Sequence, residues 1–183
     1  IRPPARSVAG ASGNRIRLGA KRVTNGGNET DLGVAFNEQV LLGRVRDREL
    51  KPDCIILLES MWRDNADKSI VASYVKTHDE LVAAGYRVYE IPMERECRRH
   101  VSDARRGKNM FALGMLCSIY SLDLQLAREQ VARIFGKKEE KVIAQNVKLL
   151  EAGFAWGEAN LDFKYAIPAK RSSVPQVVIN GNT

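Results

Sequence analysis

A three-layer α/β/α domain with a mostly parallel sheet is the fold that this sequence predicts, for three reasons. Residues 54–58 (CIILL) form an uninterrupted apolar run, which is typical of a central parallel strand covered on both faces. A helical pattern over residues 68–84 lies between this run and a second strand-like segment at residues 86–91, and a β–α–β order of this kind indicates a parallel sheet. The second half of the chain is helical in pattern.

The first fifty residues give weaker signals. Paired prolines and the small residues that follow them predict loop or irregular structure over residues 1–13. Residues 14–18 (NRIRL) alternate polar and apolar side chains, which predicts a half-exposed strand. A turn is expected at residues 25–28 (NGGN), and residues 31–40 are too short and ambiguous to assign.

The middle of the chain carries the clearest boundaries. The central strand follows Lys51-Pro52-Asp53, and the helix after it ends at Gly85, a residue that commonly follows a helix. Pro92 ends the next strand. Glu59, Ser60 and Trp62 lie in the loop after the central strand, which is where open α/β sheets place ligands. The plainer interpretation is a loop with Trp62 as a packing anchor.

Three helices are expected in the second half. Ser121 or Asp123 caps the second of them, which Gly136 closes. The third contains Gly153 and Gly157, which either permit close packing or end the helix. The first is apolar on nearly every side, a pattern that only a buried position tolerates, through Met110, Phe111, Leu113, Met115 and Leu116.

Composition excludes several classes of protein. At 183 residues, with 44% hydrophobic and 28% charged residues, the chain has the size and composition of one soluble globular domain. No apolar run approaches the length needed to span a bilayer, and no signal-peptide pattern opens the chain, so we expect a cytoplasmic location and no membrane partner. Three cysteines without a CxxC motif exclude a disulfide framework and an iron–sulfur or zinc site built from this chain alone.

The net charge of +7 is unevenly distributed. Basic residues gather before Glu29 and again over residues 95–108. Such clusters suit phosphates, acidic protein surfaces or nucleic acid, or they are solvated faces. Nucleic acid is not expected as a partner, because the sequence has no zinc-finger spacing, no RNP-like aromatic motif and no clear helix-turn-helix.

Lys108 and Asn109 are the strongest candidates for a binding site. They open the apolar helix, where free backbone N–H groups and the helix dipole favour an anion. Lysine offers a point charge to a phosphate or carboxylate, and asparagine both donates and accepts hydrogen bonds. Asparagine is also a common helix cap, so a purely structural role is the alternative.

Four segments stand out in the second half of the chain: Lys108-Asn109-Met110, Ala112-Leu113-Gly114, Gly136-Lys137-Lys138, and the helix with Asn146 and Ala152-Gly153-Phe154. Together they resemble the gamma-type domain of the 2-oxoacid:ferredoxin oxidoreductases. The chain is most similar to the version fused to the front of the alpha subunit of 2-oxoglutarate:ferredoxin oxidoreductase. The resemblance covers nearly the whole chain, is strongest over residues 86–167, and implies a Rossmann-like domain.

The resemblance implies a complex that decarboxylates a 2-oxoacid on thiamine diphosphate and Mg²⁺, forms an acyl-CoA, and passes electrons through [4Fe-4S] clusters to ferredoxin. This segment alone would be inactive and would bind none of these except coenzyme A. Its implied partners are the thiamine-binding alpha and beta parts of the same oxidoreductase, in a hetero-oligomer. Its implied coenzyme A contacts are Lys108, Asn109, Arg2, Arg6, Ser12 and Gly13.

The same resemblance sets the expected domain limits. Residues 1–174 form the gamma-type domain, without the Gly-rich βα unit that opens other members, so the sheet should lack its usual first strand. Residues 175–183, which contain INGN, resemble the start of the following thiamine-diphosphate-type domain. Two other functions stay open: a nucleotide-binding regulatory domain that uses the same sheet crevice, and a non-catalytic module for subunit interaction.

Overall fold

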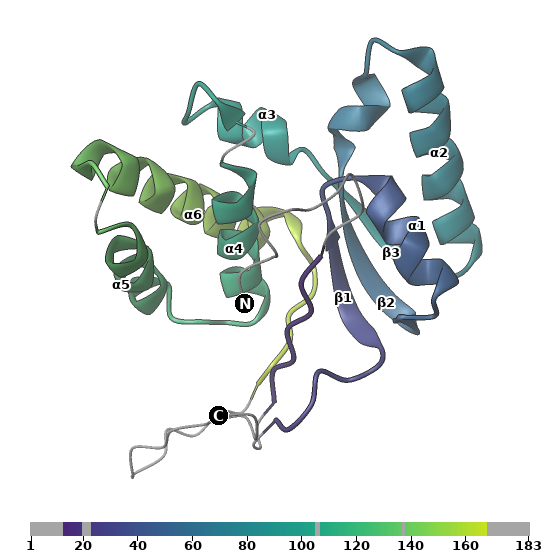
Figure 1. Cartoon of the computed structure of the whole chain (residues 1–183), viewed down its shortest axis with the longest axis horizontal. Coiled ribbons are helices and arrows are strands. Elements are labelled where there is room, and N and C mark those ends of the chain that lie inside the picture. Colours follow the sequence, from purple (N-terminus) through teal and green to yellow (C-terminus); the bar gives the residue numbers. More distant parts are fainter. Residues whose placement is uncertain (1–12, 20–22, 105–106, 137, 168–183) are drawn as a thin grey trace.

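The computed structural model describes residues 13–19, 23–104, 107–136 and 138–167. Its sheet has three parallel strands in the order β1-β2-β3, formed by Thr30–Ala35, Leu50–Glu59 and Arg87–Ile91. In Figure 1 the sheet lies between two groups of helices, with α1 and α2 on one side and α4 and α6 on the other. The predicted α/β/α architecture with a parallel sheet is therefore confirmed.

One face of the sheet is covered by α1 (Glu38–Arg46) and α2 (Lys68–Ala83), and the 3₁₀ helix η1 (Ser60–Asp64) precedes α2. Residues 54–58 of the central strand β2 are all apolar because both faces of the strand are covered. Cys54, Ile56 and Leu58 belong to the core beneath α1 and α2, whereas Ile55 and Leu57 belong to the core on the opposite face. Successive side chains of a strand point to opposite faces, so both cores need apolar residues.

The other layer contains α3 (Met93–Arg98), α4 (Lys108–Ile119), α5 (Leu124–Phe135) and α6 (Glu140–Asn160). Helices α4 and α6 lie so close that their backbones touch. A Cβ atom added at Gly114 would lie 2.0 Å from the carbonyl oxygen of Leu150, and one at Gly153 would lie 1.9 Å from that of Phe111. Gly153 therefore permits close packing and does not end α6.

The segment that follows α6 ties the helical layer to the sheet. The Tyr165 N–H donates to the Ile119 carbonyl at 2.8 Å, at the end of α4, and the Tyr165 hydroxyl lies 3.3 Å from the Asp31 carbonyl in β1. The Phe163 ring packs against Tyr89 of β3, with ring centroids 5.3 Å apart. This segment, residues 161–165, is called the strap below.

Most of the expected boundaries agree with the structure. Gly85 follows α2 with a φ of +89°, a backbone conformation that glycine adopts without strain. Asp123 caps α5 through hydrogen bonds to two backbone N–H groups, and Gly136 closes that helix. Ser121 is not the cap; it has a φ of +51° in the preceding turn.

Two expectations need correction. The strand expected over residues 14–18 is wrong: no strand is assigned within residues 13–19, and Arg15 instead pairs through its side chain with Glu49. Alternation alone does not supply a neighbouring strand to accept the backbone hydrogen bonds. The apolar helix is not buried on all sides, since Leu113 is 36% exposed.

Candidate functional site

All three strands end at the same edge of the sheet, because they are parallel. Asn37 and Glu38 follow β1, Glu59 is the last residue of β2, and Glu94 lies just after β3. The amino end of α4 brings Lys108 to the same edge, within 3.5 Å of Glu59 and Glu94. The sequence indicated the end of the central strand as a place for ligands, and the structure brings charged side chains together there.

Glu59 is the buried centre of this cluster. Its side chain has no solvent exposure, and its two oxygens accept hydrogen bonds from the backbone N–H groups of Met61 at 3.2 Å and Glu94 at 3.1 Å. Burial raises the pKa of the Glu59 carboxyl, although the nearby Lys108 ammonium and the two backbone donors oppose this effect. Glu59 thereby joins the end of β2 to the start of α3.

Lys108 lies between two carboxylates. Its Nζ atom is 3.5 Å from an oxygen of Glu59 and 3.5 Å from an oxygen of Glu94, and 3.4 Å from the sulfur of Met61. Its side chain is only 12% exposed. The pKa of Glu94 is lowered. The hydrogen bond from Arg98 has the largest effect, burial opposes it, and the Lys108 charge adds to the lowering. The Lys108 charge is thus already balanced inside the protein.

Asn109 has a different environment from its neighbour. It is exposed in the first turn of α4, a helix whose N-cap, Gly107, makes no side-chain hydrogen bond. The partial positive charge of the helix amino end is therefore not offset by a capping carboxylate. Asn109, rather than Lys108, is the residue of this pair that a bound molecule can reach.

The remaining sequence-predicted site residues are less informative. Arg2, Arg6 and Ser12 lie outside the described residues, as do residues 168–183 with the expected domain boundary. Gly13 is exposed and lies beside α1, where an added Cβ would be 3.3 Å from the Arg44 guanidinium. A role of these four residues in ligand binding stays a prediction.

A second polar network fixes η1 and α2 against β3. Glu90 accepts hydrogen bonds from the Tyr74 hydroxyl at 2.8 Å and from Nε of Arg63 at 2.7 Å, with the His78 ring 3.9 Å away. Burial tends to raise the pKa of Glu90, but the hydrogen bonds from Arg63 and Tyr74 outweigh it and the pKa is lowered. Burial likewise raises the pKa of the Tyr74 hydroxyl.

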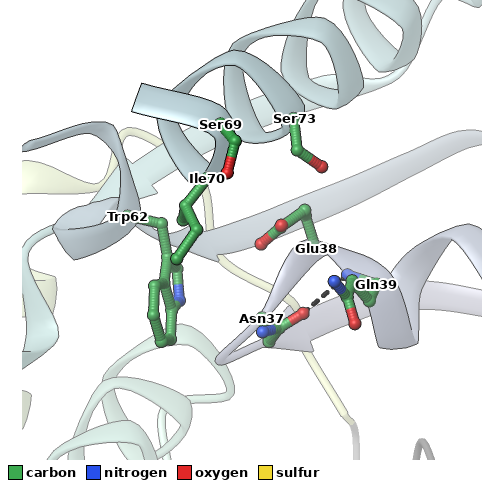
Figure 2. A pocket seen from close by; sticks show the side chains of 7 residues that line it. All are labelled: Asn37, Glu38, Gln39, Trp62, Ser69, Ile70 and Ser73. Atoms are coloured by element: carbon green, nitrogen blue, oxygen red, sulfur yellow. Dashed lines mark hydrogen bonds between the residues drawn. The ribbon is translucent and has the colours of Figure 1, made fainter. Parts of the chain in front are cut away.

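A cavity of about 230 Å³ opens between α1 and α2 at the same edge of the sheet. Trp62 forms one wall, and its position is fixed because Nε1 donates to the Phe36 carbonyl at 2.8 Å. Trp62 is therefore both a packing anchor and part of a cavity. Figure 2 shows the carboxylate of Glu38 directed into the space between the two helices, with Ile70, Ser69 and Ser73 across from it.

Glu38 was missed by the sequence analysis. It is 3% exposed, and one of its carboxylate oxygens has no hydrogen-bond partner. It lies in the stretch that the sequence left unassigned, where β1 ends and Asn37 caps α1 by accepting from the Gln39 N–H at 2.7 Å. An Asn-Glu pair after an apolar run is the signal for a helix start that was available there.

The cysteines are inert in this environment. All three thiols are buried, and burial raises the pKa of Cys97 to about 12 and that of Cys54 to about 11. Within the described parts of the chain, no group of three His, Cys, Asp or Glu side chains is placed to hold a metal ion. In the same parts, no helix combines the length and the apolar character that crossing a membrane requires.

Comparison with known proteins identifies a family, a similar sequence and a similar structure. Residues 4–156 match the family described as pyruvate ferredoxin/flavodoxin oxidoreductase. The 2-oxoglutarate oxidoreductase subunit KorA of Mycobacterium tuberculosis is 28% identical over 177 residues, which cover 92% of this chain and 27% of that protein. The 2-oxoglutarate:ferredoxin oxidoreductase from Magnetococcus marinus, solved with 2-oxoglutarate, coenzyme A and succinyl-CoA bound, has a similar fold, with a TM-score of 0.59 and 24% identity over 81% of this chain and 24% of its own. The chain spans about a quarter of the length of these relatives.

Proposed function

Because this chain belongs to the pyruvate ferredoxin/flavodoxin oxidoreductase family, we propose that it is part of a subunit of a 2-oxoglutarate:ferredoxin oxidoreductase. The complex would decarboxylate the oxoacid on thiamine diphosphate and Mg²⁺, form an acyl-CoA, and pass electrons through [4Fe-4S] clusters to ferredoxin. The observation that carries this proposal is the match to the family over residues 4–156, together with relatives whose names specify 2-oxoglutarate.

Within that complex, the chain would pack against the thiamine-binding parts and contribute to the coenzyme A site without performing the chemistry. Residues 1–174 would form this domain, with residues 175–183 opening the next one. Arg2, Arg6, Ser12 and Gly13 would add to the coenzyme A contacts.

The amino end of α4 is where we propose the coenzyme A phosphates approach. Asn109 is exposed there, the helix dipole favours negative charge, and no side chain caps the helix. Lys108 would act indirectly, since its ammonium is held by Glu59 and Glu94 and orients the first turn of α4. Replacing Lys108 would also leave Glu59 buried without a cation, so it is a poor test of ligand binding.

Asn109→Asp in the assembled enzyme is the sharper experiment. The substitution places a negative charge where the phosphates are proposed to lie, and we expect the KM for coenzyme A to rise about fivefold or more, the equivalent of roughly 1 kcal/mol. A carboxylate in the first turn stabilises a helix, so folding should not suffer. Decarboxylation of the 2-oxoacid, measured as CO₂ release, should be unchanged.

Gln125→Glu is the matched control. Gln125 is exposed and occupies the same second position of another 12-residue helix, α5, so the charge change and the helix position are alike. It should leave the KM for coenzyme A unchanged. An equal loss of both half-reactions in the Asn109→Asp enzyme would indicate faulty assembly and would contradict the proposed contact.

A further inference from the structure

The cavity between α1 and α2 is too small for a whole cofactor. Its volume of about 230 Å³ lies below the 300–1,000 Å³ of typical pockets for drug-sized ligands, so it suits a single chemical group. Its walls combine the indole of Trp62 and the side chain of Ile70 with the oxygens of Glu38, Ser69 and Ser73. Two helices and η1 contribute these walls, so the cavity is defined by the fold.

The carboxylate of Glu38 is buried beside this cavity, with one oxygen unpaired. It is 97% buried by the protein, yet one oxygen has no hydrogen-bond partner, and no ion pair to it occurs among the described residues. A buried carboxylate without a partner is destabilising, because the charge loses its hydration and gains no hydrogen bond in return. Figure 2 shows this carboxylate directed into the space that the lining side chains surround.

None of the groups in the cavity walls donates a hydrogen bond to this oxygen. The Trp62 N–H already donates to the Phe36 carbonyl, and the Ser69 hydroxyl donates to Asp67 at 2.6 Å. The cavity has no basic residue in its lining. The amides of Asn37 and Gln39 and the hydroxyl of Ser73 also line the cavity, but they are neutral. An occupant therefore meets one unpaired carboxylate, neutral polar groups and the indole ring of Trp62, a combination that favours a positively charged donor.

We propose that this cavity binds an organic cation, a primary ammonium or guanidinium group, which pairs with Glu38 and lies against Trp62. An inorganic metal ion is a poorer match, because no group of three metal-ligating side chains is found in the part of the chain that the structure describes. The cation comes either from a free small molecule or from a lysine or arginine side chain of the rest of the enzyme. The inference does not depend on the coenzyme A contact proposed above.

The test uses the purified enzyme that contains this chain, titrated calorimetrically with n-butylammonium or methylguanidinium chloride. Methylurea is the neutral counterpart of methylguanidinium. We expect at least one cation to bind saturably, methylurea not to bind, and Glu38→Gln to weaken the cation at least tenfold. Glu80→Gln is the matched control, because Glu80 is an exposed acid of α2 that forms its ion pair with Lys76; it should leave binding unchanged.

Thermal unfolding of the same variants separates the two sources. If a side chain of the enzyme already fills the cavity, neither probe binds, but Glu38→Gln lowers the unfolding midpoint by about 3 °C or more relative to Glu80→Gln. Absence of probe binding together with an unchanged or higher midpoint for Glu38→Gln overturns the proposal, because removing a truly unpaired buried charge stabilises a protein. Equal binding of methylurea and methylguanidinium overturns it as well.

Discussion

The contact between α4 and α6 makes a prediction with a clear sign. Gly114→Ala would place a Cβ atom 2.0 Å from the carbonyl oxygen of Leu150 and 2.7 Å from the backbone nitrogen of Phe154. Cβ atoms essentially never approach another heavy atom closer than 3.0 Å. Both contacts are to backbone atoms, so no rotamer change relieves them and the two helices must separate by about 1 Å.

The magnitude follows from the packing that this separation loosens. A gap of about 1 Å forfeits roughly a quarter to a half of the dispersion energy of each contact across it. Phe111, Met115, Leu149 and Leu150 are all buried in this layer. Overpacking costs about 1–3 kcal/mol where side chains can adjust, and we expect about 3 kcal/mol or more here. For an m-value of about 2 kcal/mol per molar urea, the midpoint falls by about 1.5 M.

Gly43→Ala provides the matched comparison. Gly43 also lies inside a helix, α1, but the nearest atom to an added Cβ is 4.0 Å away, on the flexible Arg46 side chain. Alanine is favoured over glycine in a helix by about 0.5–1 kcal/mol, so this variant should be more stable than the wild type. Urea denaturation followed by circular dichroism measures both. Equal midpoints for the two variants would refute the close-packing argument.

Two further predictions concern the charged cluster. Lys108→Met is expected to destabilise the protein by about 3 kcal/mol, because it leaves Glu59 buried without a cation. Adding Glu59→Gln to this variant should restore most of the lost stability. Urea midpoints of the single and double variants measure both effects, and additive losses would contradict the pairing. Since the pKa of Glu94 is lowered from 4.5 in the folded state, its stabilising contribution is present above about pH 4.5 and is lost as the pH falls through the folded pKa. Glu94→Gln should therefore lose less stability than the wild type as the pH falls from about 4.5 to about 3, and a steeper loss would show that the sign is wrong.

Much of the fold was predictable because the strongest signals come from burial. The apolar run of β2 can be recognised as a strand without knowing which strands lie beside it, because a strand covered on both faces has apolar side chains along the covered stretch. Gly85 and Asp123 mark helix ends through local backbone chemistry. Residues 14–18 show the limit of such reasoning, because a strand exists only where a neighbouring strand pairs with it, and that pairing is not encoded in a five-residue alternation.

The site was predictable in position more than in chemistry. The structure brings Lys108 to the end of the central strand, beside Glu59, and ligand binding at this edge stays a prediction. Its pairing with Glu59 and Glu94 was not foreseen, because the two glutamates are 35 residues apart in sequence and meet only when β2 and β3 lie side by side. Glu38 was missed because an unpaired carboxylate is a property of its surroundings and leaves no mark in sequence.

The strap has a consequence for the order of folding. The β–α–β units from β1 to β3 join neighbours in sequence, whereas the contact from Tyr165 to Asp31 closes a loop of 134 residues. Closing a long loop is entropically unfavourable until other contacts reward it. The sheet with α1 and α2 is therefore expected to form early and the strap to dock last. The carboxyl end of α4, where the Ile119 carbonyl accepts from the Tyr165 N–H, then reaches its final position only when the strap contacts β1.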